Sequence, residues 1–332
     1  MASNIEERRV QRLGTSSLIV TLPKKWVRKV NLKPGDKVVV LVEDDEVRIL
    51  PPSKTLPQKE KYLVKLGEIE NELLMTEIPL CLYILGLREA IIDAKGLDIS
   101  TINKVITRAS NLLGAKATCL GNNMIEMKVL VDVDEDVISM LRSVFRNLVL
   151  LLRTIIGVIE NKNKLDELLN DAKMLSNEIY KNHYAIARLT YRKSYALTGG
   201  GDHLVQVFVA PSVSQMAHMM SSIALETVQT LSVMDTRKIS KLTIELTENL
   251  IEVLDKIGNS LRGGDVEVLK EATTKISKLD KEILSKIKKS KDESLYILAK
   301  AQDFLKLLDN TASMLACWLT VSSMIKKGIL SE

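Results

Sequence analysis

The chain has 332 residues, of which 46% are hydrophobic and 27% are charged, with a formal net charge of +5. The apolar content excludes a disordered chain, and the length predicts more than one domain, because single cores rarely grow beyond roughly 250–300 residues. Only 4% of the residues are aromatic, so the core must be built from aliphatic side chains, which favours helices.

The cysteines and the apolar runs indicate where the protein works. Three widely separated cysteines are present, namely Cys81, Cys119 and Cys317. They form neither a disulfide framework nor a zinc-binding spacing, which indicates a reducing compartment, and the N-terminus has no apolar signal segment. The apolar run 144–160 carries Arg146 and Arg153 and is not typical of a membrane span. We therefore expect a cytoplasmic protein without a membrane span.

Residues 1–52 predict a β-α-β-β unit. The predicted elements are strands at 10–13 and 18–22, a short helix at 23–30, and strands at 37–42 and 46–50 joined by a hairpin turn. Pro23 suits the first helical position, and Thr21 is available as the helix cap. The following segment, 53–60, is rich in proline and polar residues and predicts a linker.

The basic residues of this unit are concentrated in one stretch. Between Arg8 and Lys37 the sequence contains nine lysines and arginines and one acidic residue, Asp36. Helical spacing of three and four puts Pro23, Trp26, Val27 and Val30 on one face of the short helix, with Lys24, Lys25, Arg28 and Lys29 on the other. Trp26 is expected to dock the helix onto the strands. A solvated lysine face remains the alternative, although the continuation of the charge onto neighbouring elements favours a nucleic acid.

The size of the unit has a separate consequence. About 45 residues of strand and short helix cannot bury enough surface to fold alone without a metal or a disulfide. We expect the unit to complete its core with a second copy of itself. A dimer would double the basic surface and give it the two-fold symmetry that suits duplex DNA.

The stretch GTSSLIVTLPKKWVRKVNLKPGDKVVVLVEDDEVRILP resembles the AbrB/MazE/SpoVT domain. The matches are Leu22–Pro23, Lys24, Arg28, Leu32, Pro34–Gly35–Asp36 and the hairpin 38–50. The resemblance implies a swapped-hairpin β-barrel dimer that binds double-stranded DNA. The DNA-binding residues it implies are Arg8, Arg9, Arg12, Thr15, Ser16, Ser17, Lys24, Lys25, Arg28 and Lys29.

Residues 61–134 predict a small α/β domain. The pattern indicates an apolar helix at 72–87, a strand at 89–95, a helix over 98–114 capped by Asp98 or Ser100, and a hairpin that turns at 121–123. The segment contains no glycine-rich phosphate-binding loop.

Residues 135–332 show helical periodicity throughout. Six helices are predicted, at 135–161, 164–196, 205–234, 237–262, 265–290 and 293–327. The segments 210–224 and 301–315 correspond at an offset of 91 residues, which favours two three-helix units in tandem.

The segment DFLKLLD, residues 303–309, resembles the last helix of PhoU-type three-helix bundles. The segments RGGDVEVLKEA and KLDKEIL are similar to the same family, and the whole domain order is similar to archaeal proteins that join an AbrB-like domain to PhoU-like bundles. That resemblance implies phosphate-linked regulation. It also implies carboxylate ligands for a divalent metal or iron, for which the candidates are Asp280, Asp303 and Asp309.

Two features of the helices have simpler interpretations. His218 stands where the first repeat would carry an acid, and a buried histidine with satisfied hydrogen bonds is preferred to a metal ligand there. The acidic stripe Glu245, Glu248, Glu252 and Asp255 lies beside an apolar seam and is expected to be a solvated face.

Together these features predict a multi-domain α+β protein: a swapped-hairpin β-barrel dimer, a small α/β insert and C-terminal tandem three-helix bundles. We interpret it as a DNA-binding transcriptional regulator linked to phosphate uptake, active as a dimer or higher oligomer, with a phosphate-transport protein as a further partner. The three histidines and the absence of a nucleophile-and-base motif predict no enzymatic activity. Three alternatives stay open: a transporter regulator that does not bind DNA, a nonspecific chromatin protein, and a metal-dependent enzyme.

Overall fold

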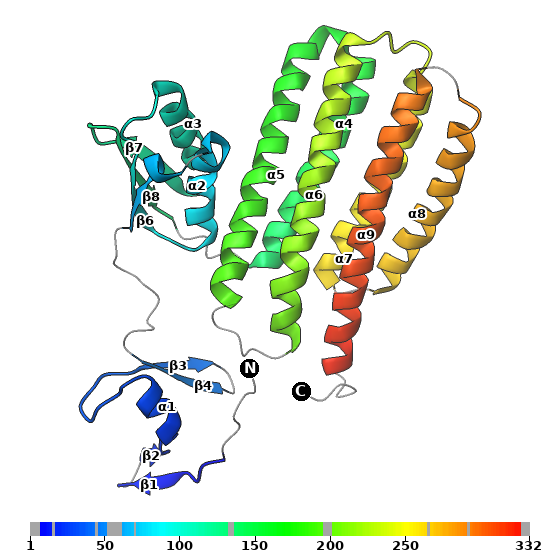
Figure 1. Ribbon diagram of the computed structural model, residues 1–332. Helices are drawn as coiled ribbons and strands as arrows, with labels where there is room; N and C mark the ends of the chain where they lie inside the picture. Colours follow the sequence, from blue (N-terminus) through cyan, green and yellow to red (C-terminus); the bar gives the residue numbers. More distant parts are fainter. Residues whose placement is uncertain are drawn as a thin grey trace. The chain divides into compact units, whose positions relative to one another are not determined.

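The computed structural model describes residues 7–14, 17–43, 46–51, 62–69, 71–131, 136–194, 201–263, 266–290 and 293–326. The chain divides into two compact units, residues 1–61 and residues 62–332 (Figure 1). The fold is multi-domain α+β and mostly helical, as predicted. The predicted linker at 53–60 and the hairpin turn at 44–45 lie outside the described residues.

The N-terminal unit consists of two hairpin sheets and one short helix. The first sheet pairs β1 (Gln11–Leu13) with β2 (Ser17–Ile19), and the second pairs β3 (Val39–Glu43) with β4 (Glu46–Leu50), both antiparallel. The helix α1 (Lys24–Lys29) lies between them in the chain. The observed order is β-β-α-β-β, so the predicted label β-α-β-β counted one strand too few, although each of the five predicted elements is present. Strand β2 ends earlier than the expected Leu22.

Two turns fix the path of the chain around α1. Pro23 occupies the N-cap, and no side chain caps the helix, so the predicted cap at Thr21 is wrong. After the helix, Asn31 has a φ of 52° and Gly35 a φ of +92°, backbone conformations that asparagine and glycine tolerate best. The Asp36 carboxylate accepts a 2.7 Å hydrogen bond from the backbone N–H of Lys33 and closes the second turn.

The second unit begins with a mixed four-stranded sheet in the order β5-β6-β8-β7. The strands are β5 (Tyr62–Lys65), β6 (Glu89–Asp93), β7 (Ala115–Cys119) and β8 (Met124–Val129). The helices α2 (Glu72–Ile84) and α3 (Ile99–Ser110) pack against each other beside this sheet (Figure 1). Asp98 caps α3 by accepting a 2.8 Å bond from the Thr101 N–H, which decides between the two predicted caps. The strand β5, which pairs parallel with β6, was not predicted.

Six long helices form the rest of the unit, and each matches a predicted helix to within a few residues. They are α4 (Val137–Glu160), α5 (Leu165–Ser194), α6 (Gly201–Val233), α7 (Ser240–Gly263), α8 (Val266–Ile287) and α9 (Ser294–Lys326). Short 3-10 turns at Leu66–Glu68 and Lys162–Lys164 precede α2 and α5. The aliphatic composition is reflected in the core, where one continuous cluster of buried residues runs from α4 to α9.

The helices contact one another as two groups of three. Helices α4, α5 and α6 pack together, and so do α7, α8 and α9. The two groups join through α4 against α7 and α6 against α9 (Figure 1). The first members of both groups are 24 residues long and the third members are 33 residues long, which agrees with a tandem arrangement.

A buried arginine ties the sheet domain to the bundle. Arg188 of α5 is 2% exposed, and its guanidinium donates hydrogen bonds to the backbone carbonyls of Tyr83, at 2.6 Å, and Leu87, at 3.1 Å. A buried guanidinium is tolerated only where carbonyl or carboxylate oxygens replace its water shell. Among the helices that the structure describes, none has the combination of length and low charge needed to cross a bilayer.

Candidate nucleic-acid interface

The short helix α1 has two chemically distinct faces. Pro23, Trp26, Val27 and Val30 are half-buried, whereas Lys24, Lys25, Arg28 and Lys29 are exposed. The helical spacing predicted this division. The four cations are therefore on the exposed side of the helix, where lysine and arginine can reach phosphate oxygens.

The other predicted DNA-binding residues lie on the chain before α1. Arg8, Arg9, Arg12 and Ser17 are exposed, and Arg12 stands opposite Leu18 in the β1–β2 ladder. Thr15 and Ser16 lie outside the described residues. Residues 8–37 include nine basic residues and one acidic residue, Asp36. The Asp36 carboxylate accepts a hydrogen bond within the turn before β3. The unit therefore carries a strong local excess of positive charge.

The strands of this unit expose apolar side chains that a stable sheet would cover. No residue of β1, β2 or α1 is buried. The exposed apolar residues of the described part of the unit are Val10, Leu13, Leu18, Ile19, Val20, Val40, Val42 and Val47. An isolated two-stranded hairpin is marginally stable at best. One copy of the unit thus lacks a core of its own.

The three carboxylates suggested for metal binding do not converge. Asp280 of α8 and Asp309 of α9 line one hollow together with Lys306, while Asp303 pairs with Lys306 at 3.8 Å. The described residues contain no group of three or more histidines, cysteines and acids close enough to share a metal. Two carboxylates beside an ammonium group do not fit a hard cation, which requires several converging oxygens. The metal assignment therefore has no support from this geometry.

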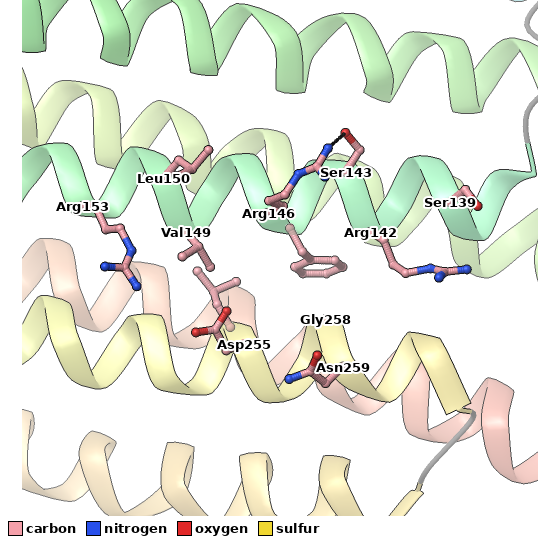
Figure 2. Close-up of a pocket in the computed structure, with 12 residues that line it drawn as sticks. Ser139, Arg142, Ser143, Arg146, Val149, Leu150, Arg153, Asp255, Gly258 and Asn259 are labelled. Atoms are coloured by element: carbon pink, nitrogen blue, oxygen red, sulfur yellow. Dashed lines mark hydrogen bonds between the residues drawn. The ribbon is translucent and has the colours of Figure 1, made fainter.

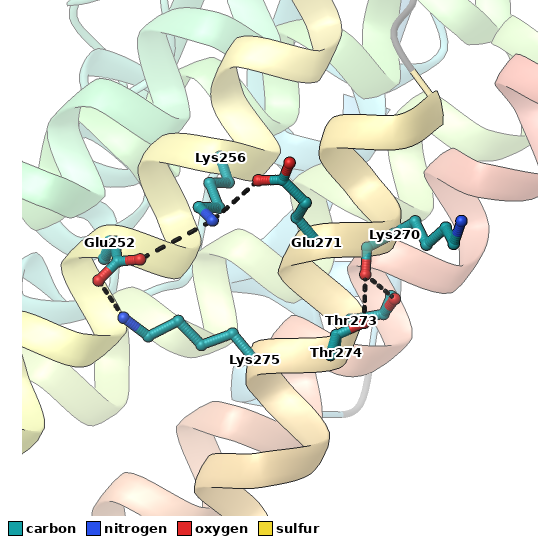
Figure 3. Close-up of polar contacts among 7 residues, drawn as sticks. All are labelled: Glu252, Lys256, Lys270, Glu271, Thr273, Thr274 and Lys275. Atoms are coloured by element: carbon teal, nitrogen blue, oxygen red, sulfur yellow. Dashed lines mark hydrogen bonds and ion pairs between the residues drawn. The ribbon is translucent and has the colours of Figure 1, made fainter.

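The acidic stripe on α7 forms ion pairs with lysines. Figure 3 shows Glu252 between Lys256 of its own helix and Lys275 of α8, with Lys256 also paired with Glu271 at 3.0 Å. Glu245 pairs with Lys286 at 3.5 Å. These groups are partly exposed, so each pair contributes little to stability. The expected solvated face is present, and lysines of α8 pair with two of its four carboxylates, Glu245 and Glu252.

Two histidines of α5 and α6 form a pair that was not predicted from the sequence. The rings of His183 and His218 stack with centroids 5.7 Å apart, and His183 Nδ1 lies 3.0 Å from the Ser214 hydroxyl. Burial, followed by the neighbouring His218, lowers the pKa of His183 to about 4, and a hydrogen bond with Gln215 partly opposes the shift. Burial, followed by the charge of Arg108, also lowers the pKa of His218.

The expectation of a satisfied His218 is corrected by this geometry. His218 Nδ1 is buried and has no hydrogen-bond partner among the described residues. His183 and His218 lie on different helices and are 35 positions apart in the chain. Helical periodicity therefore could not predict that their rings would stack.

Comparison with known proteins gives one partial match. A family model described as antidote-toxin recognition MazE, bacterial antitoxin, matches residues 11–57. No curated protein and no solved structure matches the chain. The match covers the unit that carries the two-faced helix, and it indicates a DNA-binding or antitoxin-type regulatory role for that part of the chain.

Proposed function

We propose that the protein is a dimeric, DNA-binding transcriptional regulator without catalytic activity, and that its helical bundles link DNA binding to phosphate uptake. One observation carries the DNA-binding part: Trp26 and Val27 are half-buried on one face of α1, and Lys24, Lys25, Arg28 and Lys29 are exposed on the other. The MazE-type match over residues 11–57 supports the same assignment. The ten residues named from the sequence form the proposed DNA contact.

The link to phosphate is supported by the helical region. Six helices in two groups of three are the arrangement that the PhoU resemblance implies, and the segment 303–309 that carries the resemblance lies on α9. In this proposal the bundles sense phosphate status or contact a phosphate-transport protein. The protein acts in the cytoplasm, where both DNA and the inner side of a transporter are accessible.

Dimer formation through the N-terminal unit can be tested by one substitution. Leu18 is 71% exposed in a single chain, so Leu18→Lys should be harmless to a monomer. In a shared sheet the lysine would be buried beside the partner's apolar strands, and we expect dissociation to monomers in sedimentation analysis. Val233→Lys, at a residue of α6 that is 85% exposed, is the matched control. Unchanged assembly of the Leu18 variant would contradict the shared core.

DNA binding by the full-length protein tests the proposed function itself. We expect gel shifts at low salt on both random duplexes and duplexes from upstream regions, with the apparent affinity falling steeply as salt increases. A preference for particular upstream sites, mapped genome-wide under phosphate starvation and repletion, would distinguish a regulator from a nonspecific chromatin protein. Absence of any shift at low salt would favour a transporter regulator that does not bind DNA.

A further inference from the structure

A groove between α4 and α7 combines several donors of positive charge. It has a volume of about 490 Å³ and is lined on α4 by Ser139, Arg142, Ser143, Arg146 and Arg153, and on α7 by Asp255 and Asn259. In Figure 2, Arg142 and Arg153 extend from α4 toward α7 at opposite ends of the groove, while the Arg146 guanidinium is turned toward Ser143 on its own helix. Three guanidiniums against one carboxylate give the groove a local charge of +2.

Among the described residues, Arg142, Arg146 and Arg153 have no carboxylate partner. None of them forms an ion pair with any residue in the described part of the chain, and the Arg142 Nε is buried without a hydrogen-bond partner. The Arg146 guanidinium has only a long contact of 3.4 Å with the Ser143 hydroxyl. This differs from α7 and α8, where Lys256 and Lys275 are paired with acids. Unpaired guanidiniums in a groove are typical of sites that bind anions.

Spacing along α4 indicates how long the anion must be. Residues 142, 146 and 153 recur at intervals of four and seven, which puts them on one side of the helix. At 1.5 Å per residue, the outer two are separated by about 16 Å along the helix axis. Arginine side chains attached that far apart along one helix are better matched by a chain of linked phosphoryl groups, which carries charge along its length, than by a single phosphate ion.

The rest of the lining favours a phosphorylated small molecule over an acidic protein segment. A docking peptide helix needs apolar anchors that enter pockets. Here Phe145 is only 2% exposed and Leu150 is 43% exposed, so the groove offers one accessible apolar side chain. The Ser139 and Ser143 hydroxyls and the Asn259 amide instead provide further hydrogen-bond donors. The volume lies within the range of small-molecule sites.

We propose that the groove between α4 and α7 binds an oligophosphate chain through Arg142, Arg146 and Arg153. Inorganic polyphosphate and the triphosphate of a nucleotide are the two sources of that chemistry. The regulatory meaning of the site rests on the proposed function, in which the bundles report phosphate status. Its ligand chemistry follows from the groove alone.

Calorimetric titration of the full-length protein with tripolyphosphate, ATP and orthophosphate, at constant ionic strength, tests the proposal. We expect tripolyphosphate to bind at least about tenfold more tightly than orthophosphate, because its linked phosphoryl groups can make more charge-assisted contacts with the arginines. The triple variant Arg142→Gln, Arg146→Gln, Arg153→Gln should raise the Kd for tripolyphosphate by at least about a hundredfold. Tighter binding of ATP than of tripolyphosphate would identify the nucleotide as the source, and the reverse would identify polyphosphate.

A matched variant removes the same charge elsewhere on the bundle. Lys173, Lys238 and Lys241 are exposed, and their replacement by glutamine should leave the Kd for tripolyphosphate unchanged. Thermal melting of each variant checks folding, and the single variant Arg153→Gln, at an exposed residue, replaces the triple variant if the latter does not fold. Equal binding by the wild-type protein and the arginine variants would overturn the proposal, as would no binding by the wild type.

Two further measurements separate this site from the DNA interface and from a protein-docking groove. The triple arginine variant should bind duplex DNA as the wild type does, and a loss of DNA affinity would reassign the groove to DNA. A glutamate-rich peptide should not displace tripolyphosphate. If the peptide bound more tightly than tripolyphosphate, the groove would be a protein-docking site and the proposal would be wrong. Failure of DNA binding by the wild type would contradict only the proposed function.

Discussion

The double variant Lys24→Ala, Arg28→Ala should bind every duplex about a thousandfold more weakly than the wild type at about 0.1 M salt. Both side chains are exposed on the outer face of α1, so their removal leaves the half-buried face with Trp26 unchanged. In a dimer the double substitution removes four cations. If each neutralises one phosphate, the slope of log Kobs against log salt should become shallower by about 3.6, which is four times 0.9.

Fluorescence anisotropy at several salt concentrations measures both the affinity and the slope. The variant Lys278→Ala, Lys281→Ala removes the same charge from the exposed face of α8 and should retain the wild-type slope. Because phosphate contacts are independent of sequence, the loss should be nearly the same for specific and random duplexes. Unchanged affinity and slope in the α1 variant would show that the basic face of α1 is only a solvated surface.

The helical unit should lose stability as the pH falls from 7 to 4, because His183 is buried in its neutral form. Its pKa in the folded protein is about 4, below the value of about 6.5 in an unfolded chain. Between these values the unfolded state binds more protons, so stability is fully present above pH 6.5 and declines below it. The contribution lost is about 2 kcal/mol by pH 5 and about 3 kcal/mol by pH 4.

The surroundings of His183 explain why protonation is unfavourable. Its Nδ1 lies 3.0 Å from the Ser214 hydroxyl and its ring stacks on His218, while Arg108 adds a positive charge near His218. Protonating either ring would place a positive charge in a site with little water. For His183 the neighbouring group is His218, and for His218 it is Arg108. The lowered pKa of His218 adds to the loss in the same direction.

Urea unfolding of the full-length protein, followed by its helical circular dichroism signal at several pH values, measures this dependence. The variant His183→Asn can retain a hydrogen bond with Ser214 but cannot be protonated. The variant should be less stable than the wild type at pH 7, and its stability should change less between pH 6.5 and pH 4. The carboxylates titrate in both proteins, so the difference between the two profiles reports the contribution of His183. Parallel profiles for the two proteins would exclude His183 as the titrating group.

Local patterns were sufficient for the elements with strong periodicity. All six bundle helices were predicted, because apolar residues recurring every three or four positions define one buried face whatever the partner helix is. The same rule divided α1 correctly into an apolar and a basic face. Gly35, part of the Pro34–Gly35–Asp36 match, has a φ of +92°, which glycine adopts more readily than other residues. By contrast, the predicted cap at Thr21 is wrong, because Pro23 occupies the N-cap position and no side chain caps α1.

The elements that depend on distant partners were not readable. The strand β5 has only four residues, and its parallel pairing with residues of β6 that lie 28 positions later provides the hydrogen bonds that make it a strand. Arg146 and Arg153 appeared in the sequence only as interruptions of an apolar run. Their spacing could have indicated a shared face, but nothing local indicated that α7 would form the other wall of a groove.

The sequence by itself determined the helices, the basic face of α1 and the resemblance of residues 11–57 to a DNA-binding or antitoxin-type domain. The tertiary structure alone decided which helices are neighbours, and with that the His183–His218 pair, the ion pairs between α7 and α8, and the arginine groove on α4. The physical reason is range: helix formation depends on residues within one turn, whereas a site on packed helices depends on which faces share a core.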